Sequence, residues 1–188
     1  MKIYHLSTEY IPSIEANAAC IGFFDGVHIG HQKLIATCRK IAEEKHIKTC
    51  LITFDQDPGN IVSNEDRFQI NTLEQREALY EKYGIDILVI ICFDRDMMKT
   101  SPEDFIKKYL NALNIDTLVC GFDFRFGFKG QGDSGTLSSS SICAFDVEVV
   151  PEVTYYGKKV SSTRIKEEIR KGNYRMADRM LGYHYEHE

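Results

Sequence analysis

The chain has 188 residues, of which 43% are hydrophobic and 27% charged, and its formal net charge is −5. These values are typical of a soluble globular protein with one domain of ordinary size. The acidic balance argues against a broad basic surface for nucleic acid. No apolar run approaches the roughly 20 residues that cross a bilayer, and the first residues do not begin a signal peptide, so no membrane partner is expected.

The cysteines indicate a reducing compartment. No two of them form a Cys-x-x-Cys pair, and most lie inside apolar runs, where a free thiol behaves as a small hydrophobic group. We therefore predict a cytoplasmic protein with neither a disulfide framework nor a zinc site. The six residues are Cys20, Cys38, Cys50, Cys92, Cys120 and Cys143.

Predicted strands and helices alternate along the first two thirds of the chain. Residues 18–24 form an apolar run typical of a buried strand, and residues 29–45 carry apolar side chains at helical spacing. The elements expected next, in chain order, are a strand at 47–54, a long polar loop at 55–71, a helix at 72–83, a strand at 85–93, a helix at 101–113 and a strand at 116–121.

Residues 122–135 interrupt the alternation with a segment rich in phenylalanine and glycine, which we expect to be a loop. A strand at 145–150 and an edge strand at 155–160 follow, and then helices at 163–171 and 173–181. This order predicts an α/β fold with a parallel sheet and helices on both faces. Ligands of such folds bind at the carboxyl ends of the strands, where several polar segments of this chain would meet.

The first such segment is Gly22–His31, between a predicted strand and a predicted helix. His28 and His31 lie three residues apart, with Gly30 between them. Helix amino ends bind anions, and an imidazole there can donate to a phosphate oxygen. A capping or surface role and a zinc pair are the alternatives. The glycines, Asp25 and the preceding strand favour the phosphate site, and no cluster supplies the further zinc ligands.

Residues 160–166 form a second candidate for binding phosphate. Ser162 and Thr163 open a predicted helix, and Arg164 and Lys166 follow within its first turns. Hydroxyls, free N–H groups and cations at a helix start suit a phosphate. The alternative is an ordinary capped helix with solvated basic residues.

Two further segments follow predicted strands. Residues 121–130 place several phenylalanines in a glycine-rich loop, which could form a flat slot for a planar ring, with Asp123 and Arg125 at its polar edges. The alternative is that one or two of these phenylalanines enter the core. Asp55 and Asp57 could orient a cation or a sugar hydroxyl, or belong to a solvated turn. Neither a P-loop nor a dinucleotide-binding glycine motif is present.

Together and in this order, these four segments resemble the FMN adenylyltransferase (FAD synthetase) module of bacterial bifunctional riboflavin kinase/FAD synthetases. Residues 24–31 match F-D-G-V-H-x-G-H, residues 121–127 match G-x-D-F-x-F-G, and residues 161–165 match S-S-T-R-I. Thr-Leu-Glu at 72–74 and the segment at 181–185 also correspond. The resemblance covers almost the whole chain and implies a Rossmann-like parallel sheet of the nucleotidyltransferase (H-x-G-H) type.

The resemblance implies the reaction ATP + FMN → FAD + pyrophosphate, with Mg²⁺, carried out by a single domain over residues 1–188 without a riboflavin kinase domain. It implies no metal ligand among named residues. The residues implied to hold the phosphates and stabilise the transition state are His28, His31, Ser162, Thr163, Arg164 and Lys166. Those implied for the ATP pocket are Gly22, Phe24, Asp25, Gly26 and Gly30. Those implied for FMN are Asp123, Phe124, Arg125, Phe126, Gly127 and Asp55.

Three positions depart from the family pattern. Asp57 stands where the family has the histidine of F-D-P-H-P, Phe23 replaces a frequent asparagine, and Lys166 replaces an arginine. An added carboxylate near a polyphosphate weakens binding unless a cation lies close by. Two alternatives therefore stay open: transfer to another phosphomonoester, and a flavin- or nucleotide-binding module without catalysis.

Overall fold

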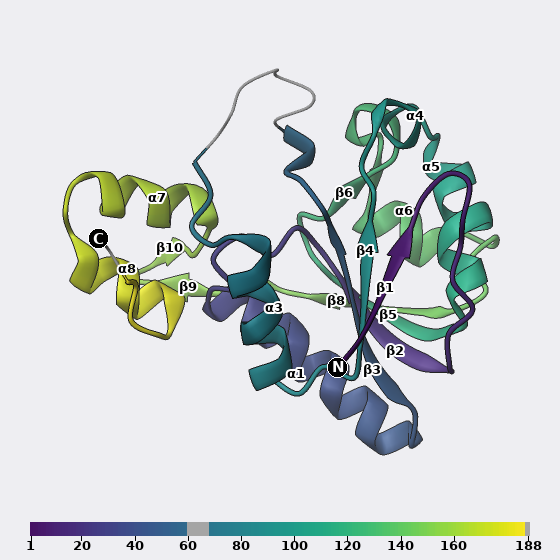
Figure 1. The fold of residues 1–188 in the computed structure, drawn as a ribbon, viewed down its shortest axis with the longest axis horizontal. Coiled ribbons are helices and arrows are strands. Elements are labelled where there is room, and N and C mark those ends of the chain that lie inside the picture. The colour runs from purple at the N-terminus through teal and green to yellow at the C-terminus, as the bar shows by residue number, and fades with distance from the viewer. Residues whose placement is uncertain (60–67, 187–188) are drawn as a thin grey trace.

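A six-stranded parallel sheet forms the centre of the computed structural model, which describes residues 1–59 and 68–186. The strand order is β1-β4-β3-β2-β5-β8, and every neighbouring pair is parallel (Figure 1). The strands are β1 (Lys2–Leu6), β2 (Asn17–Ile21), β3 (Lys48–Phe54), β4 (Ile87–Ile91), β5 (Ile115–Gly121) and β8 (Asp146–Val150). The chain leaves β2 toward β3 on one side and later returns to add β5 on the other. The carboxyl end of β2 is therefore the point where such folds bind ligands.

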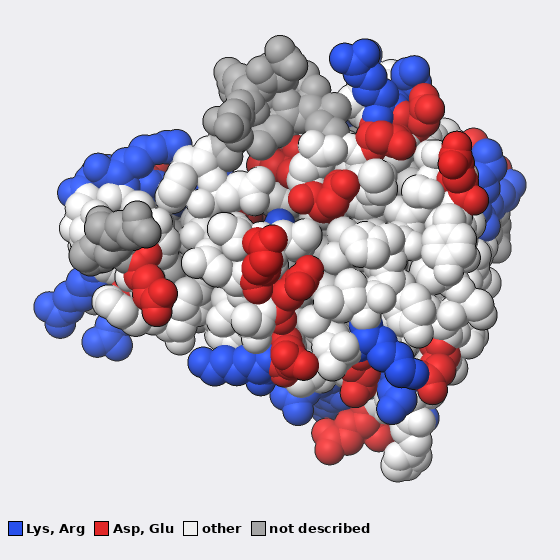
Figure 2. Space-filling model, viewed as in Figure 1, with Lys and Arg blue, Asp and Glu red and all other residues white. Residues whose placement is uncertain are grey.

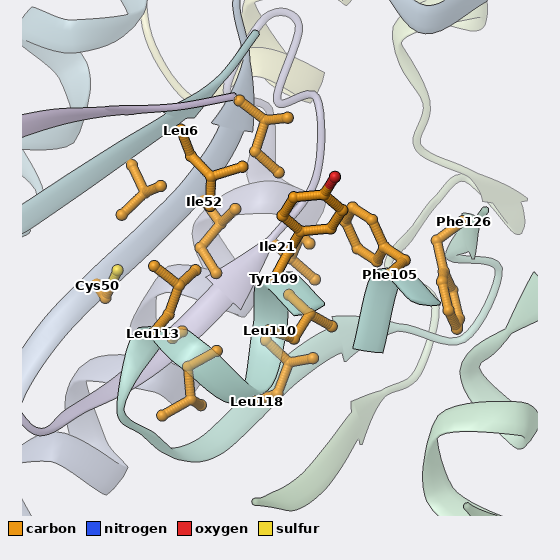
Figure 3. Close-up of a cluster of buried hydrophobic side chains, with 14 of the residues drawn as sticks. Leu6, Ile21, Cys50, Ile52, Phe105, Tyr109, Leu110, Leu113, Leu118 and Phe126 are labelled. Atoms are coloured by element: carbon orange, nitrogen blue, oxygen red, sulfur yellow. The ribbon is translucent and has the colours of Figure 1, made fainter. Parts of the chain in front are cut away.

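Helices cover both faces of this sheet, as predicted from the alternation. One face packs on α1 (Ile29–Lys45) and α3 (Leu73–Lys82). The opposite face packs on a larger apolar cluster, of which Figure 3 shows a part that includes Leu6, Ile52 and Phe105. The elements over that face are α4 (Arg95–Met98), α5 (Pro102–Asp104), the π-helix η1 (Phe105–Tyr109), the 3₁₀-helix η2 (Leu110–Leu113) and α6 (Ser134–Ser139).

Two small hairpins and a helix pair complete the described chain. The hairpins are β6 (Arg125–Phe126) with β7 (Gly132–Asp133) and β9 (Thr154–Tyr155) with β10 (Lys158–Lys159), and a short 3₁₀-helix, η3 (Phe128–Gly130), lies within the first. The helix pair α7 (Ser162–Arg170) and α8 (Tyr174–Leu181) forms its own apolar cluster beside the start of α1, at the left of Figure 1.

Several predicted boundaries were wrong. The strand expected at 18–24 ends at Ile21, and the helix expected at 101–113 is a short α-helix followed by π and 3₁₀ turns. The segment 122–135 holds a hairpin and the start of α6 rather than a loop alone, and 155–160 is part of a separate hairpin rather than an edge of the main sheet. Strand β1 was not predicted. Of the loop expected at 55–71, residues 60–67 lie outside the described residues.

The surface carries charges of both signs. Figure 2 shows acidic and basic side chains interspersed on the face viewed, with no single basic surface there. Within the described residues, no helix combines the length and the apolar character needed to cross a bilayer. All six cysteines are free thiols.

Candidate active site

The turn between β2 and α1 has an unusual backbone. Phe24 and Val27 have φ values of 58° and 35°, and Gly26 has 81°. A bulky residue in the left-handed region is strained, so such a conformation persists only where surrounding contacts impose it. Gly26 is needed for space as well, because a Cβ there would lie 2.8 Å from the Ile70 side chain. The fold therefore maintains a strained backbone in this turn, and backbone strain of this kind is common at functional sites.

Contacts with Asp25 and Gly26 impose that conformation. The buried Asp25 carboxylate accepts a hydrogen bond from the Ile70 backbone N–H at 2.8 Å and pairs with the Lys166 ammonium at 2.7 Å. Its carbonyl accepts from the Ser162 hydroxyl at 2.7 Å, and the Tyr183 hydroxyl donates to the Gly26 carbonyl at 2.8 Å. Helix α7 and the end of α8 thus clamp the turn that precedes the histidines.

The two histidines stand at the amino end of α1. His28 is the N-cap, and its Nδ1 accepts from the His31 backbone N–H at 3.3 Å. The two rings stack with centroids 3.6 Å apart, and the His31 ring packs edge-on against Phe24. Since Nδ1 of His28 is an acceptor, the neutral ring carries its proton on Nε2.

Burial sets the protonation of both rings. It lowers the pKa of His28 to about 4, against an ordinary value of 6.5. Burial, with smaller effects of His28 and of the Arg76 charge, also holds the pKa of His31 well below its ordinary value. Both imidazoles are therefore neutral at pH 7, and each can donate one hydrogen bond to an anion.

A polar cleft of about 390 Å³ joins the amino ends of α1 and α7. Helix α7 begins at Ser162, with Ser161 as N-cap accepting from the Arg164 backbone N–H. Two helix amino ends directed at one cleft favour an anion there. Polar or small residues that line this phosphate cleft are Gly22, His28, Gly30, His31, Gly121, Asp123, Glu152, Lys159, Ser161, Ser162 and Thr163.

Two cations expected in this cleft lie elsewhere. Lys166 is the buried partner of Asp25, with only 13% of its side chain exposed. The Arg164 guanidinium donates to the carbonyls of Tyr155, Lys158 and Lys159, at 2.9 to 3.3 Å, and so fastens the β9–β10 hairpin to α7. Neither side chain lines the phosphate cleft.

Lys159 is the cation that lines the cleft, and the sequence reasoning missed it. Its ammonium pairs with the Asp123 carboxylate and lies over the Phe122 ring, 4.9 Å from the centroid. The signal in the sequence was a pair of lysines, Lys158 and Lys159, one residue before the Ser-Ser-Thr turn. The Lys159–Asp123 pair links the 122–135 segment to β10 across the cleft.

A second, aromatic cleft of about 830 Å³ lies beside the first. Its wall is mostly phenylalanine and methionine, with Arg125 and Lys129 as cations, which suits a planar ring that carries polar groups. The lining residues include Phe23, Phe54, Phe93, Met97, Met98, Phe105, Asp123, Phe124, Arg125, Phe126, Gly127, Phe128 and Lys129. Five of the six residues implied for FMN are in this wall.

The 122–130 segment is fixed in place rather than free. The Phe128 backbone N–H donates to the Thr100 carbonyl at 2.7 Å. Gly127 has φ +72°, and a Cβ there would lie 2.7 Å from the Pro102 nitrogen, so the segment approaches α5 too closely for a side chain. Phe126 is buried against Phe105, which bears out the expectation that one of the phenylalanines enters the core. These contacts hold the segment that lines the aromatic cleft in one position.

The two clefts meet at Gly22, Asp123 and Phe124, which line both. Gly22 directly follows β2, and the other two follow the neighbouring strand β5. The polar cleft and the aromatic cleft therefore adjoin at the carboxyl ends of two central strands.

Other implied site residues lie outside both clefts. Phe24 is fully buried between His31 and Tyr80, and Asp25 and Gly26 belong to the turn itself. Asp55 accepts from the Phe93 backbone N–H at 3.0 Å and so ties the ends of β3 and β4 together. These four residues shape or support the site, and the structure does not bring them to a cleft surface.

The position that departs from the family histidine also lies outside the clefts. The Asp57 carboxylate accepts from the Gly59 backbone N–H at 2.8 Å, as in a short Asx turn. Asp57 lines neither cleft, although the following Pro58 and Gly59 line the aromatic one. Its added charge therefore stands beside the clefts rather than inside them.

The carboxylates that line the phosphate cleft decide whether it could hold Mg²⁺. Among the described residues, no group of three or more His, Cys, Asp or Glu side chains could hold a metal ion. Asp123 and Glu152 line the phosphate cleft. Mg²⁺ in nucleotide sites is commonly held by one or two carboxylates together with substrate phosphates. The residues present fit a cation of that kind.

Comparison with known proteins agrees with this arrangement. The sequence profile of the FAD synthetase family matches residues 11–164. The chain belongs to this family. A bifunctional riboflavin kinase/FMN adenylyltransferase of Listeria monocytogenes is 36% identical over 167 residues, and the match covers 88% of this chain and 53% of that protein. The corresponding protein of Bacillus subtilis is 32% identical, with 98% of this chain and 60% of that protein covered.

A shorter relative and two solved structures extend the comparison. A FAD synthetase of Listeria monocytogenes is 31% identical, with 97% of this chain and 75% of that protein covered. The chain spans little more than half the length of the two bifunctional relatives. A structure titled as a macrolide-efflux protein from Streptococcus pneumoniae has a TM-score of 0.87 at 26% identity, covering 98% of this chain and 72% of that one. Pantothenate synthetase of Thermus thermophilus, at 14% identity and a TM-score of 0.54, covering 97% of this chain and 81% of that one, shares the fold.

Proposed function

We propose that this chain is an FMN adenylyltransferase, which transfers AMP from ATP to FMN and yields FAD and pyrophosphate. The observation that carries the proposal is the junction of the two clefts at Gly22, Asp123 and Phe124. One cleft has the chemistry of a phosphate site and the other that of a planar ring. A reaction that joins a nucleotide to a flavin phosphate needs both, with the reacting phosphates between them.

In this proposal the triphosphate of ATP lies in the phosphate cleft. Neutral His28 and His31 donate from one side. The Thr163 hydroxyl and the first backbone N–H groups of α7 donate from the other, while the Ser162 hydroxyl stays on the Asp25 carbonyl. The Lys159 ammonium adds positive charge at the same cleft. Donors fixed before the reaction stabilise the charge that develops at phosphorus without reorganising.

FMN occupies the aromatic cleft with its phosphate at the junction. An oxygen of that phosphate attacks the α-phosphorus of ATP, the bond from the α-phosphorus to the bridging oxygen breaks, and pyrophosphate leaves with the electron pair. The attacking oxygen is already anionic, so no general base is required. The rate enhancement comes from alignment of the two phosphates and from neutralisation of their charge. Mg²⁺, held by Asp123 or Glu152 and the phosphates, would add to that neutralisation when bound.

Two broader proposals accompany the activity. Residues 1–188 act as one adenylyltransferase domain, which the continuous sheet and the clamp of the C-terminal helices on the Asp25 turn support. The protein works in the cytoplasm, a proposal that its six free thiols support.

The decisive test is product formation. The chain is incubated with ATP, Mg²⁺ and FMN, and FAD and pyrophosphate are measured by chromatography and a coupled phosphate assay. We expect the two products in equal amounts, and none when riboflavin, which lacks the phosphate nucleophile, replaces FMN. Product from a different phosphomonoester alone, or tight flavin and nucleotide binding without turnover, would each contradict the proposal.

A further inference from the structure

Arg76 on helix α3 is a buried cation outside both clefts. Its side chain is among the most buried in the protein, with 1% of the residue exposed. Among the described residues, no carboxylate forms an ion pair with it, and its Nε has no hydrogen-bond partner. A buried guanidinium without an acidic partner is costly, so its contacts should account for its presence.

The Arg76 guanidinium acts on the buried Tyr80 hydroxyl and makes two contacts with one residue of the strained turn, Phe23. The Arg76 Nη1 donates to the Phe23 carbonyl at 2.6 Å, and the guanidinium lies over the Phe23 ring, 4.5 Å from its centroid. The Thr53 hydroxyl donates to the same carbonyl at 3.1 Å. Two donors on one carbonyl fix the plane of the peptide that joins Phe23 to Phe24, and the cation–π contact fixes the ring.

The two side chains that flank this peptide serve different clefts. Phe23 lines the aromatic cleft and packs with the apolar cluster on one face of the sheet. Phe24, in its left-handed conformation, packs with the cluster on the other face. Its ring contacts the His31 ring, with the two centroids 5.1 Å apart. A rotation of this peptide would therefore displace a wall of one cleft and the support of a histidine in the other.

We propose that Arg76 is a positioning residue, which holds the Phe23–Phe24 peptide so that the flavin wall and the phosphate-cleft histidine keep their places together. This inference rests on the proposed function, since it assigns the residue that couples its two clefts. Arg76 itself touches neither substrate. Its effect reaches the flavin through Phe23 and the triphosphate through Phe24 and His31.

The experiment compares Arg76→Met with Arg76→Lys in steady-state kinetics. Met keeps an unbranched apolar stem, shorter than that of Arg, and removes every donor. We expect the KM for FMN to rise about tenfold and kcat to fall about tenfold, because a charge-assisted hydrogen bond is lost. Lys keeps a charge and can reach the carbonyl, so it should recover part of both losses. Thr53→Val removes the second donor and should raise the KM for FMN about threefold, for the loss of a neutral hydrogen bond.

Two controls separate positioning from stability. Leu79→Ala weakens the packing of the same helix away from Phe23, and it should lower the melting temperature with the KM for FMN unchanged. In a Phe23→Ala background, Arg76→Met should add less than about a twofold change in the KM for FMN, because the wall that Arg76 positions is already gone.

Flavin fluorescence quenching on FMN binding gives a readout that does not require turnover. If the unmodified chain makes no FAD, the proposed function fails, while the quenching titration still tests the coupling of Arg76 to Phe23. If the chain makes FAD and Arg76→Met lowers only the melting temperature, with KM and kcat unchanged, the positioning role is overturned. Equal effects of Arg76→Met with and without Phe23 would also overturn it.

Discussion

The amino ends of α1 and α7 form the two sides of the phosphate cleft, but they use their side chains differently. At α1, both predicted histidines line the cleft. At α7, the hydroxyl residues line it, whereas Arg164 holds a hairpin and Lys166 pairs with Asp25. Sequence spacing shows which charges lie near a helix start. It does not show whether a ligand or the protein's own carbonyls and carboxylates will satisfy them.

The largest expected effect is at α1. His31→Ala should lower kcat by about 10²- to 10³-fold, the usual loss when a fixed donor to a developing anion is removed. Thermal unfolding of the same variant should shift far less than activity, since the ring lies at the cleft. His184→Ala is the matched control, because this exposed ring pairs with Asp178 and lines neither cleft. The substitution should leave kcat within about twofold. An unfolded or fully active His31→Ala would contradict the role assigned to α1.

The second largest effect is expected for a substitution in α7, and it should lower stability rather than activity. Lys166→Met leaves the Asp25 carboxylate buried without its cation, so the free energy of unfolding should fall by about 3–5 kcal/mol in urea titrations. Lys171→Met, which removes an ion pair to Glu168 with an exposed lysine, should cost less than about 1 kcal/mol. A large rise in the KM for ATP with unchanged stability would instead place Lys166 among the phosphate ligands.

Stability should also depend on pH through His28. Its pKa is about 4 in the folded chain and 6.5 when unperturbed, so the unfolded state binds the proton more tightly. The contribution of the neutral ring is therefore complete above pH 6.5 and is lost as the pH falls toward 4, on the order of 3 kcal/mol in total. Urea titrations at several pH values measure it, and His28→Gln should flatten the slope in this window. A slope unaltered by that substitution would contradict the burial argument.

The smallest effect concerns Asp57, beside the clefts. Asp57→His restores the usual family residue and removes a negative charge, so kcat/KM for ATP should stay equal or rise by about two- to fivefold, in line with weak screened Coulomb terms. The adenylyl-transfer assay used for the other variants measures it. A loss of more than about tenfold would show that the carboxylate has a role of its own, since it exceeds any effect of surface charge.

The elements predicted most accurately from the sequence are those whose structure depends on residues close by in the chain. The buried run that became β4, the helix α1 and the helix start near Thr72 were all predicted from local spacing. Strand β1 was missed because it is an edge strand with mostly exposed positions and no strong apolar pattern. The end of β2 was misplaced because the backbone of Phe24 depends on partners far along the chain.

The same reason explains why several implied site residues lie outside the clefts. Asp25 follows a strand and precedes a helix, as a ligand-facing acid would, but in the fold its carboxylate contacts Lys166 and the Ile70 backbone N–H instead. Arg164 was a plausible phosphate ligand until the hairpin carbonyls before it were positioned. By contrast, the two histidines and residues 121–127 lie beside glycines and directly after predicted strands. These neighbours were enough to place them at the site from the sequence alone. Their roles toward substrates stay predictions until they are tested.

The clamp on the Asp25 turn has a consequence for biosynthesis on the ribosome. The hydroxyl of Tyr183 reaches the carbonyl of Gly26 across 157 positions. A nascent chain can assemble β2 to β5 as they emerge, but the histidine turn lacks the hydrogen bond from Tyr183 until that residue has also left the exit tunnel. Nucleotide affinity should therefore arise only after most of the sheet has formed, once Tyr183 has emerged.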